Sequence, residues 1–352
     1  MISSLLFKVQ SSKFRIWVLG FGLLAASCHS GTKSNQQVKG ADSAAMHGDT
    51  ITPKINSYTN RIAANSKDAD AYYNRGKLEL EVKMLGGSLS DLTKAVQLDS
   101  TKSDYYYYLA DVEFITGHTH EARDAFDRSI KLNPKNTDAM LKLAELYFYI
   151  KKYDDAIDLI DQAIAVNKYI AREYFLKGMI YTEKHDTMKA ISSMQTAVEQ
   201  DPDYFNAYVQ LGLLFASKGN GIALTYYDDA IRLQPQNPEP YYDKGMFYQF
   251  GGDNEDAIKA YNEVLEVDST YKFAYYNLGV IYNLNKNDYS KSLEYFNKAI
   301  RCDSVYYMAY FGRANCYEML KQKDNAMADY AHAYRINPKF KEAEAAYKKL
   351  KK

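Results

Sequence analysis

The chain has 352 residues, of which 47% are hydrophobic and 25% are charged, a composition typical of a folded protein rather than of a disordered one. Its 44 basic and 44 acidic residues give a formal net charge of zero. This balance argues against a protein held on nucleic acid by electrostatic attraction, because such proteins carry a basic face. The sequence also contains 34 tyrosines and only one tryptophan, an excess that the fold must explain.

The amino-terminal segment has the pattern of an export signal. Lys8, Lys13 and Arg15 precede the apolar run 16–27, and no acidic residue lies in this part of the chain. The run has 12 residues, whereas a helix needs about 20 to cross a bilayer. A basic start, a short apolar core and small residues at the end are typical of a segment that directs export.

The small residues end at Cys28, and "LLAASC" resembles the lipobox of bacterial lipoproteins. The resemblance implies a lipoprotein signal peptide at residues 1–28 and an acylated Cys28 that tethers the exported protein to the cell envelope. With no acidic residue directly after Cys28, the chain is similar to lipoproteins that reside in the outer membrane and face the periplasm. A plain secretory signal or an uncleaved anchor is the alternative. Residues 29–52 are small, polar and without pattern, which predicts a flexible tether.

From residue 69 onward the sequence repeats itself. Eight segments, from "AYYNRGKLEL" to "AYFGRANCYE", carry a small residue at the same point. These residues are Gly76, Ala110, Ala144, Gly178, Gly212, Gly245, Gly279 and Ala314. Their spacings are 34, 34, 34, 34, 33, 34 and 35 residues. Such a period indicates a solenoid, in which each supersecondary unit packs against its neighbours.

This repeat resembles the tetratricopeptide repeat, a pair of antiparallel helices of about 34 residues. Further alanines recur at fixed points, and prolines close four of the units: Ala122, Ala156, Ala190; Pro134, Pro202, Pro235 and Pro338. Small residues let two helices approach closely, and a proline ends the second helix because it has no backbone N–H to donate. The resemblance implies an all-α fold, a right-handed α-solenoid of about eight helix pairs in one continuous array. The predicted repeats are residues 69–102, 103–136, 137–170, 171–204, 205–237, 238–271, 272–306 and 307–340, together 69–340.

Extra helices are predicted at both ends of the array. Residues 53–68 are expected to form an N-terminal extra helix in front of the first repeat. Residues 341–352 are expected to form a C-terminal capping helix that gives the last apolar face a polar exterior. The basic end "KKLKK" leaves contact with anionic lipid as an alternative role for this helix.

The run "YYYY" at residues 105–108 falls in the first helix of the second repeat. We number each repeat from its first residue, so that Ala69 holds place 1 and Tyr106 holds place 4, where the family carries a large packing residue. Place 5 lies about 100° further around the helix, on the same side as places 9 and 12. In the family this side lines the inner surface of the superhelix. We therefore expect Tyr107 to face a groove, with Tyr105 and Tyr108 on its flanks.

The residues at places 5, 9 and 12 are called the inner stripe below. Its large side chains form the predicted binding groove: Tyr73, Tyr107, Phe175, Met179, Tyr242, Met246, Tyr276 and Phe311. An apolar surface of this kind typically marks a site for a partner. The stripe lacks the lysine, asparagine and arginine pattern with which some family members clamp the terminal carboxylate of a peptide.

No catalytic or metal-binding pattern stands out. The repeats leave no room for a catalytic domain of ordinary size, and no Gly-rich phosphate loop, His-Glu-x-x-His pair or Gly-x-Ser-x-Gly elbow occurs. His118 and His120 lack a third ligand, so neither a metal nor another cofactor is expected. Cys302 and Cys316 stand where other repeats carry leucine or isoleucine, which favours two reduced thiols in the core. A disulfide between them is the alternative.

The sequence therefore predicts a non-enzymatic, membrane-tethered scaffold. It would bind an extended protein or peptide segment in its aromatic-lined groove, within an assembly of the cell envelope, and no nucleic acid. The alternative is a glycan- or nutrient-binding outer-membrane lipoprotein, because tyrosine rings stack on sugar rings as readily as on peptide side chains.

Overall fold

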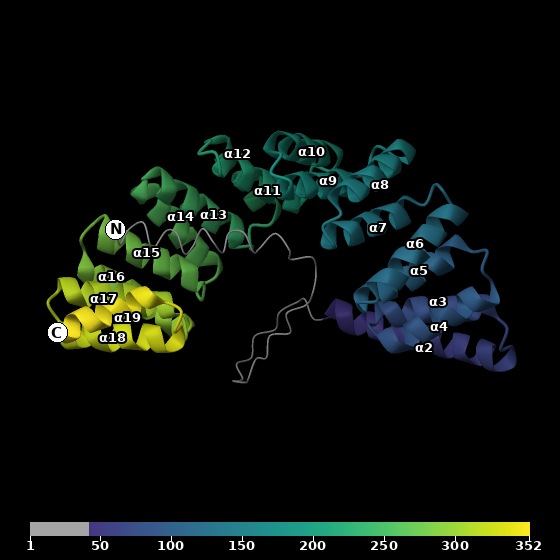
Figure 1. Cartoon of the computed structure of the whole chain (residues 1–352), viewed down its shortest axis with the longest axis horizontal. Helices are drawn as coiled ribbons and strands as arrows, with labels where there is room; N and C mark the ends of the chain where they lie inside the picture. Colours follow the sequence, from purple (N-terminus) through teal and green to yellow (C-terminus); the bar gives the residue numbers. More distant parts are fainter. Residues whose placement is uncertain (1–41) are drawn as a thin grey trace. The chain divides into compact units, whose positions relative to one another are not determined.

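The structure is a computed structural model that describes residues 42–352, with side chains from Ile51 onward (Figure 1). The predicted signal peptide, Cys28 and the predicted tether up to residue 41 lie outside the described residues. Within residues 42–352 the regular structure consists of helices alone.

The described chain divides by its internal contacts into two compact units, one ending at Leu214 and the other spanning Phe215–Lys352. The first compact unit contains α2 (Asp42–Ala64), α3 (Ala69–Glu81), α4 (Leu85–Leu98), α5 (Ser103–Ile115), α6 (Thr119–Leu132), α7 (Thr137–Tyr149), α8 (Tyr153–Val166), α9 (Ala171–Glu183), α10 (Thr187–Gln200) and most of α11 (Phe205–Ala216). The second contains α12 (Ile222–Leu233), α13 (Glu239–Gly251), α14 (Asn254–Val267), α15 (Lys272–Leu284), α16 (Tyr289–Cys302), α17 (Tyr307–Met319), α18 (Lys323–Ile336) and α19 (Lys341–Lys351).

The boundary between the two compact units falls within the shortest repeat. The two helices of that repeat, α11 and α12, have 12 residues each. In every other repeat the first helix has 13 residues and the second has 14, as in α7 and α8.

Each first helix is followed by a tight turn that needs one residue in the left-handed region. Glycine supplies that residue in three turns, at Gly117, Gly219 and Gly252. Five other turns use Lys83, Lys151, His185, Asn287 and Lys321, with φ between 54° and 62°. Several helices then begin on a side-chain cap; the Asn136 carboxamide, for example, accepts the Ala139 N–H at 3.0 Å. The turn and capping residues therefore set where each helix starts and where the chain reverses direction.

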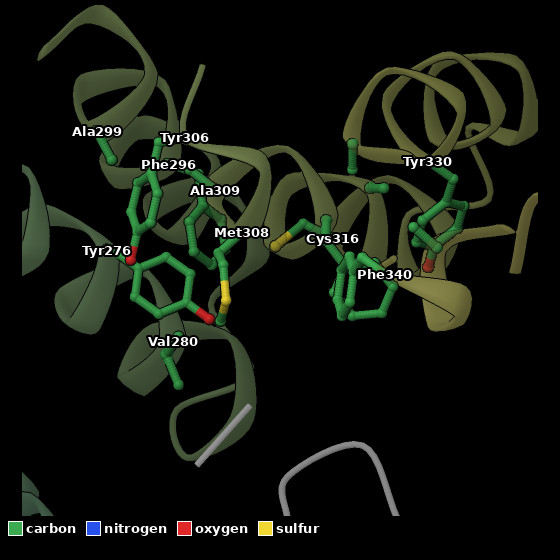
Figure 2. Packing of buried hydrophobic residues seen from close by; sticks show 14 of the residues in the cluster. Tyr276, Val280, Phe296, Ala299, Tyr306, Met308, Ala309, Cys316, Tyr330 and Phe340 are labelled. Carbon is green, nitrogen blue, oxygen red and sulfur yellow. The ribbon is translucent and has the colours of Figure 1, made fainter. Parts of the chain in front are cut away.

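The core lies between the two helices of each pair and between adjacent pairs. Figure 2 shows its largest cluster, in the second compact unit, where the rings of Tyr276, Phe296 and Tyr306 gather. The small residues act as predicted at the closest helix crossings. A methyl group on Gly245 would lie 2.6 Å from the Tyr261 ring, and one on Gly279 would lie 2.8 Å from the Phe296 ring. These positions leave room for a large ring because they carry no side chain of their own.

The helix at the carboxyl end has the predicted position, whereas the helix at the amino end is longer than predicted. At the carboxyl end, α19 packs on α18 and buries Ala343, as a capping helix would. At the amino end, α2 begins at Asp42 rather than at residue 53, with Pro53 inside it. Part of the predicted tether is thus helical, and Ile51 is buried. Because the residues before Pro53 carry no repeat pattern, their helix was not predictable from repeat phase.

None of the described helices combines the length and the apolar composition that a membrane span requires.

Candidate functional site

The tyrosine run on α5 distributes its four rings differently from the prediction. Tyr105, expected on a flank, is the most buried of the four at 3% exposure. Its ring stacks on Tyr73 with centroids 4.7 Å apart, and its hydroxyl donates to the Asp70 carboxylate of α3. Most other repeats carry alanine at this place, as at Ala71. A tyrosine there extends into the space against the preceding first helix, which repeat phase alone does not reveal.

The other three rings of the run stay half-buried. Tyr107 lies 6.2 Å from Phe126 and meets Tyr108 edge-on at 5.0 Å. The Lys77 ammonium lies 4.9 Å from the centre of the Tyr108 ring. Tyr106, predicted to pack within the helix pair, contacts the core around Phe126. These rings cover the junction of α3, α5 and α6, and parts of them face solvent.

The inner stripe proves to be partly core. Four of the eight predicted groove residues are buried: Met179 at 3%, Met246 at 5%, Tyr276 at 1% and Phe311 at 6% exposure. Their prediction as open groove residues is wrong, because other core side chains cover them; Tyr276 meets Tyr306 at 5.4 Å (Figure 2) and Phe311 meets Phe340 at 4.9 Å. The other four, Tyr73, Tyr107, Phe175 and Tyr242, are half-buried and keep accessible ring surface.

In the first compact unit a chain of ion pairs joins α5, α7 and α9 beside the inner stripe. The Lys142 ammonium lies 3.1 Å from Asp111 Oδ1, a close ion pair without hydrogen-bond geometry, and 3.7 Å from Glu145 Oε2. The Arg172 guanidinium lies 2.5 Å from Glu145 Oε1. Asp111 and Glu145, the acidic residues at place 9 of their repeats, are thus neutralised by the next first helices. Sequence spacing missed this chain because its partners stand at different places in successive repeats.

The aromatic side chains of Tyr107, Phe175 and Tyr204 lie near this chain of ion pairs. Phe175 meets Tyr204 edge-on at 5.0 Å, and burial raises the pKa of Tyr204 to about 12. Tyr107, with its pKa raised by burial and by the charge of Asp111, lies on α5, at the other end of the chain of ion pairs. Both tyrosines therefore remain neutral hydrogen-bonding groups at physiological pH, and this face offers rings and hydroxyls rather than net charge.

In the second compact unit, a cluster of aromatic side chains surrounds Tyr242. Its ring lies 5.3 Å from Tyr271, 5.7 Å from Tyr261 and 6.3 Å from Phe273. A buried hydrogen-bond network holds the cluster in place. The Asn277 amide donates to the hydroxyls of Tyr242 at 3.2 Å and Tyr261 at 3.0 Å. Tyr242 is thus both a packing residue and a surface residue.

Among residues 51–352, the cysteines and histidines form no metal or disulfide site. Both cysteines are free; Cys316 is buried as predicted, whereas Cys302 is exposed because it is the last residue of α16. Burial raises the pKa of Cys316 to about 11, so its thiol stays protonated. His118 stands at the N-cap position of α6 without a side-chain capping hydrogen bond, and its Nδ1 lies 2.8 Å from the Thr116 hydroxyl. Across residues 51–352, no group of three or more His, Cys, Asp or Glu side chains is placed to hold a metal.

A pocket lies away from the inner stripe, on α3 and α4. It is lined by Tyr72, Gly86, Leu89, Ser90, Asp91, Thr93, Lys94 and Gln97 and has a volume of about 540 Å³. None of the eight predicted groove residues lines it.

Comparison with known families agrees with the repeated helix pairs described above. A tetratricopeptide-repeat model matches residues 171–204, 274–305 and 309–340, and two further repeat models match 226–259 and 246–286. The chain contains tetratricopeptide repeats. A model described as "Anaphase-promoting complex, cyclosome, subunit 3" matches residues 92–163. The predicted fold class, an all-α solenoid of tetratricopeptide helix pairs, is confirmed.

Curated relatives match over short stretches. The chain is 31% identical over 115 residues to the probable UDP-N-acetylglucosamine–peptide N-acetylglucosaminyltransferase SPINDLY of Hordeum vulgare, covering 30% of this chain and 12% of the relative. It is 32% identical over 96 residues to the cellulose synthase operon protein C of Pseudomonas fluorescens, covering 26% of this chain and 7% of the relative. The chain therefore spans no more than 12% of the length of either.

Two solved tetratricopeptide-repeat structures share the fold, and a third is similar over part of the chain. A tetratricopeptide-repeat protein from Cytophaga hutchinsonii superposes with a TM-score of 0.58 at 22% identity, covering 68% of this chain and 98% of that one. One from Parabacteroides merdae gives 0.51 at 14% identity, covering 71% and 99%. YrrB, described as having an unusual peptide-binding site, gives 0.44 at 26% identity, covering 56% and 97%.

Proposed function

We propose that the protein is a non-enzymatic scaffold that binds an extended protein segment along the accessible part of its inner stripe. The observation that carries this proposal is the partial exposure of Tyr107 and Phe175 beside ion pairs that already neutralise one another. Half-buried rings on a rigid helical support can anchor a partner at a small entropic cost, and such anchors often dominate an interface. Tetratricopeptide repeats supply the rigid support.

A paired comparison on α9 tests this proposal. A peptide that binds the full chain is first selected from a random displayed library, and its affinity is then measured for Phe175→Ala and Tyr174→Ala. Tyr174 is the adjacent place-4 residue and is also half-buried. We expect Phe175→Ala to weaken binding by about tenfold or more, since anchor residues cost about 2 kcal/mol when truncated, with a nearly unchanged melting temperature. Tyr174→Ala should leave the affinity near that of the parent.

The outcomes separate the candidate functions. Equal affinities for the two variants would contradict binding at the inner stripe. If no peptide is recovered but immobilised envelope glycans retain the protein and free sugar elutes it, the glycan-binding alternative is favoured instead.

The proposed location is the outer membrane, facing the periplasm, with a lipid on Cys28 as the anchor. Its support is the sequence pattern that ends at Cys28. Acyl chains contribute about 0.8 kcal/mol per buried methylene, so several chains together hold a protein on the membrane. Cys28→Ser should leave an unprocessed or soluble form, measured by fractionation and by the mass of the amino-terminal peptide. A variant that is processed and membrane-bound like the parent would contradict the anchor.

A further inference from the structure

Three tyrosines of the first two repeats form a row of contacting rings at the inner stripe. Tyr73 on α3 and Tyr107 on α5 both hold place 5 of their repeats. Tyr108 contacts both of them, with its ring centre 5.7 Å from that of Tyr73 and 5.0 Å from that of Tyr107. All three side chains are half-buried and keep accessible surface. These three rings are called the tyrosine row below.

The repeat fold does not require a ring at the centre of the tyrosine row. Tyr108 holds place 6, and no other repeat carries an aromatic residue there. Its side chain packs against the buried cluster that contains Leu92 and Val112, yet it is not enclosed. An aromatic residue that keeps open surface and has no counterpart in the other repeats is better explained by a ligand than by helix packing.

Buried neighbours hold the outer rings of the tyrosine row in place. Tyr73 stacks on Tyr105 with centroids 4.7 Å apart, and Tyr105 is 3% exposed. Tyr107 lies 6.2 Å from the fully buried ring of Phe126. Rings that are already ordered lose little conformational freedom when a partner binds, which favours affinity.

The rings of the row meet edge-on rather than in one plane. The planes of Tyr73 and Tyr108 are inclined at 68°, and those of Tyr107 and Tyr108 at 82°. Such a row presents ring surfaces in different directions instead of one flat face. A sugar ring stacks on a flat aromatic face, whereas the compact, puckered proline ring can contact two inclined rings at once. The geometry therefore favours proline over a sugar.

The polar groups of the row suit a partner that offers hydrogen-bond acceptors. Burial raises the pKa values of Tyr73 and Tyr107, so both hydroxyls keep their protons at physiological pH and can donate hydrogen bonds. A proline residue has a backbone carbonyl but no backbone N–H. A segment rich in proline thus brings acceptors to the tyrosine hydroxyls without leaving donors of its own unpaired.

We propose that the tyrosine row binds a proline-rich segment of the partner in the polyproline II conformation. The inference rests on the proposed binding of an extended protein segment and names its chemical class. One turn of a polyproline II helix has three residues and is about 9 Å long. Both outer rings lie within 5.7 Å of Tyr108, so the row is comparable in length to one such turn. The polyproline II helix is itself preformed, which lowers the entropic cost of docking on an aromatic surface.

The test measures fluorescence anisotropy of a fluorescein-labelled decaproline peptide with the full chain, and uses a Gly-Ser repeat of equal length as the flexible probe. We expect the Gly-Ser peptide to bind about tenfold more weakly or less, because it has no rings and must be ordered on binding. Tyr108→Leu should weaken decaproline binding by about fivefold or more, since leucine keeps apolar bulk but removes the aromatic face. Tyr108→Phe keeps that face and should stay within about twofold of the parent.

The matched control is Tyr106→Leu in the same tyrosine run. Tyr106 is also half-buried, but its ring faces α6, where the Arg128 guanidinium lies 5.9 Å from its centre. This change should alter decaproline affinity by less than about twofold, because Tyr106 lies outside the tyrosine row. If Tyr108→Leu lowers the melting temperature, Tyr107→Leu decides, since it removes an outer ring of the row and should cause the same loss of affinity.

Equal affinities for decaproline and the Gly-Ser peptide, or equal effects of Tyr108→Leu and Tyr106→Leu, would overturn the inference. Binding of cellohexaose that Tyr108→Leu abolishes, without binding of decaproline, would also overturn it and favour a glycan ligand. If decaproline does not bind while the selected peptide depends on Phe175, the proline-rich class is refuted and the scaffold proposal stands. Decaproline binding that depends on Tyr108, with no effect of Phe175→Ala on the selected peptide, would instead count against the scaffold proposal alone.

Discussion

Replacing Gly245 by alanine should destabilise the second compact unit through a single steric contact. The new methyl group would lie 2.6 Å from Tyr261 Cε1 and 2.8 Å from Cδ1. Ordinary contact begins near 3.4 Å, so the ring would have to move by about 0.8 Å. It has little freedom to do so, because Tyr261 is fully buried and its hydroxyl donates to Gln249 and accepts from Asn277.

The size of the effect follows from two opposing contributions. Overpacking a core costs about 1–3 kcal/mol, and alanine gains about 1 kcal/mol over glycine in a helix. We expect a net loss of about 0–2 kcal/mol for Gly245→Ala. Gly178→Ala should also destabilise, since its added methyl group would lie 2.6 Å from Cγ of the fully buried Met194 and 3.3 Å from the Ala190 carbonyl oxygen. Gly86→Ala is the matched control: no atom lies within 4 Å of its added methyl group, so it should stabilise by a few tenths of a kcal/mol.

The urea midpoints of the three glycine variants, monitored by far-ultraviolet circular dichroism, give the order of their stabilities. The double variant Gly245→Ala/Tyr261→Leu isolates the contact, since removing the ring should recover about 1 kcal/mol relative to the sum of the single changes. The reasoning fails if Gly245→Ala stabilises as Gly86→Ala does, or if the double variant loses the full sum.

Two further predictions concern buried polar groups. Tyr276 is 1% exposed and its hydroxyl has no hydrogen-bond partner, so Tyr276→Phe should raise the free energy of unfolding by about 1 kcal/mol. Tyr276→Ala should instead lower it by about 3–5 kcal/mol. A lower urea midpoint for Tyr276→Phe than for the parent would contradict this prediction. Both carboxylate oxygens of Glu173 are buried without a partner, and burial, with the charge of Asp138, raises its pKa to about 7. The folded state therefore holds this proton more tightly than the unfolded state, and stability should fall as the pH rises from about 4.5 to about 7. Glu173→Gln should reduce that fall in urea midpoints at pH 5 and pH 7.5, and identical slopes for parent and variant would count against the burial argument.

The ion pairs on the inner stripe were not predictable from repeat phase. Phase fixes which side of a helix a residue occupies, but ion pairs such as Arg172–Glu145 join different places in successive repeats.

By itself the sequence determined the helix pairs and the roles of the small residues, because a 34-residue period and recurring Gly or Ala leave one way to pack antiparallel helices. The tertiary structure alone decided how deeply each side chain lies. Tyr105 is more buried than Tyr106, and Tyr276 is core whereas Tyr242 keeps open surface. The reason is that burial depends on the side chain that the next repeat brings over each position, and that neighbour varies in size from repeat to repeat while the phase stays constant.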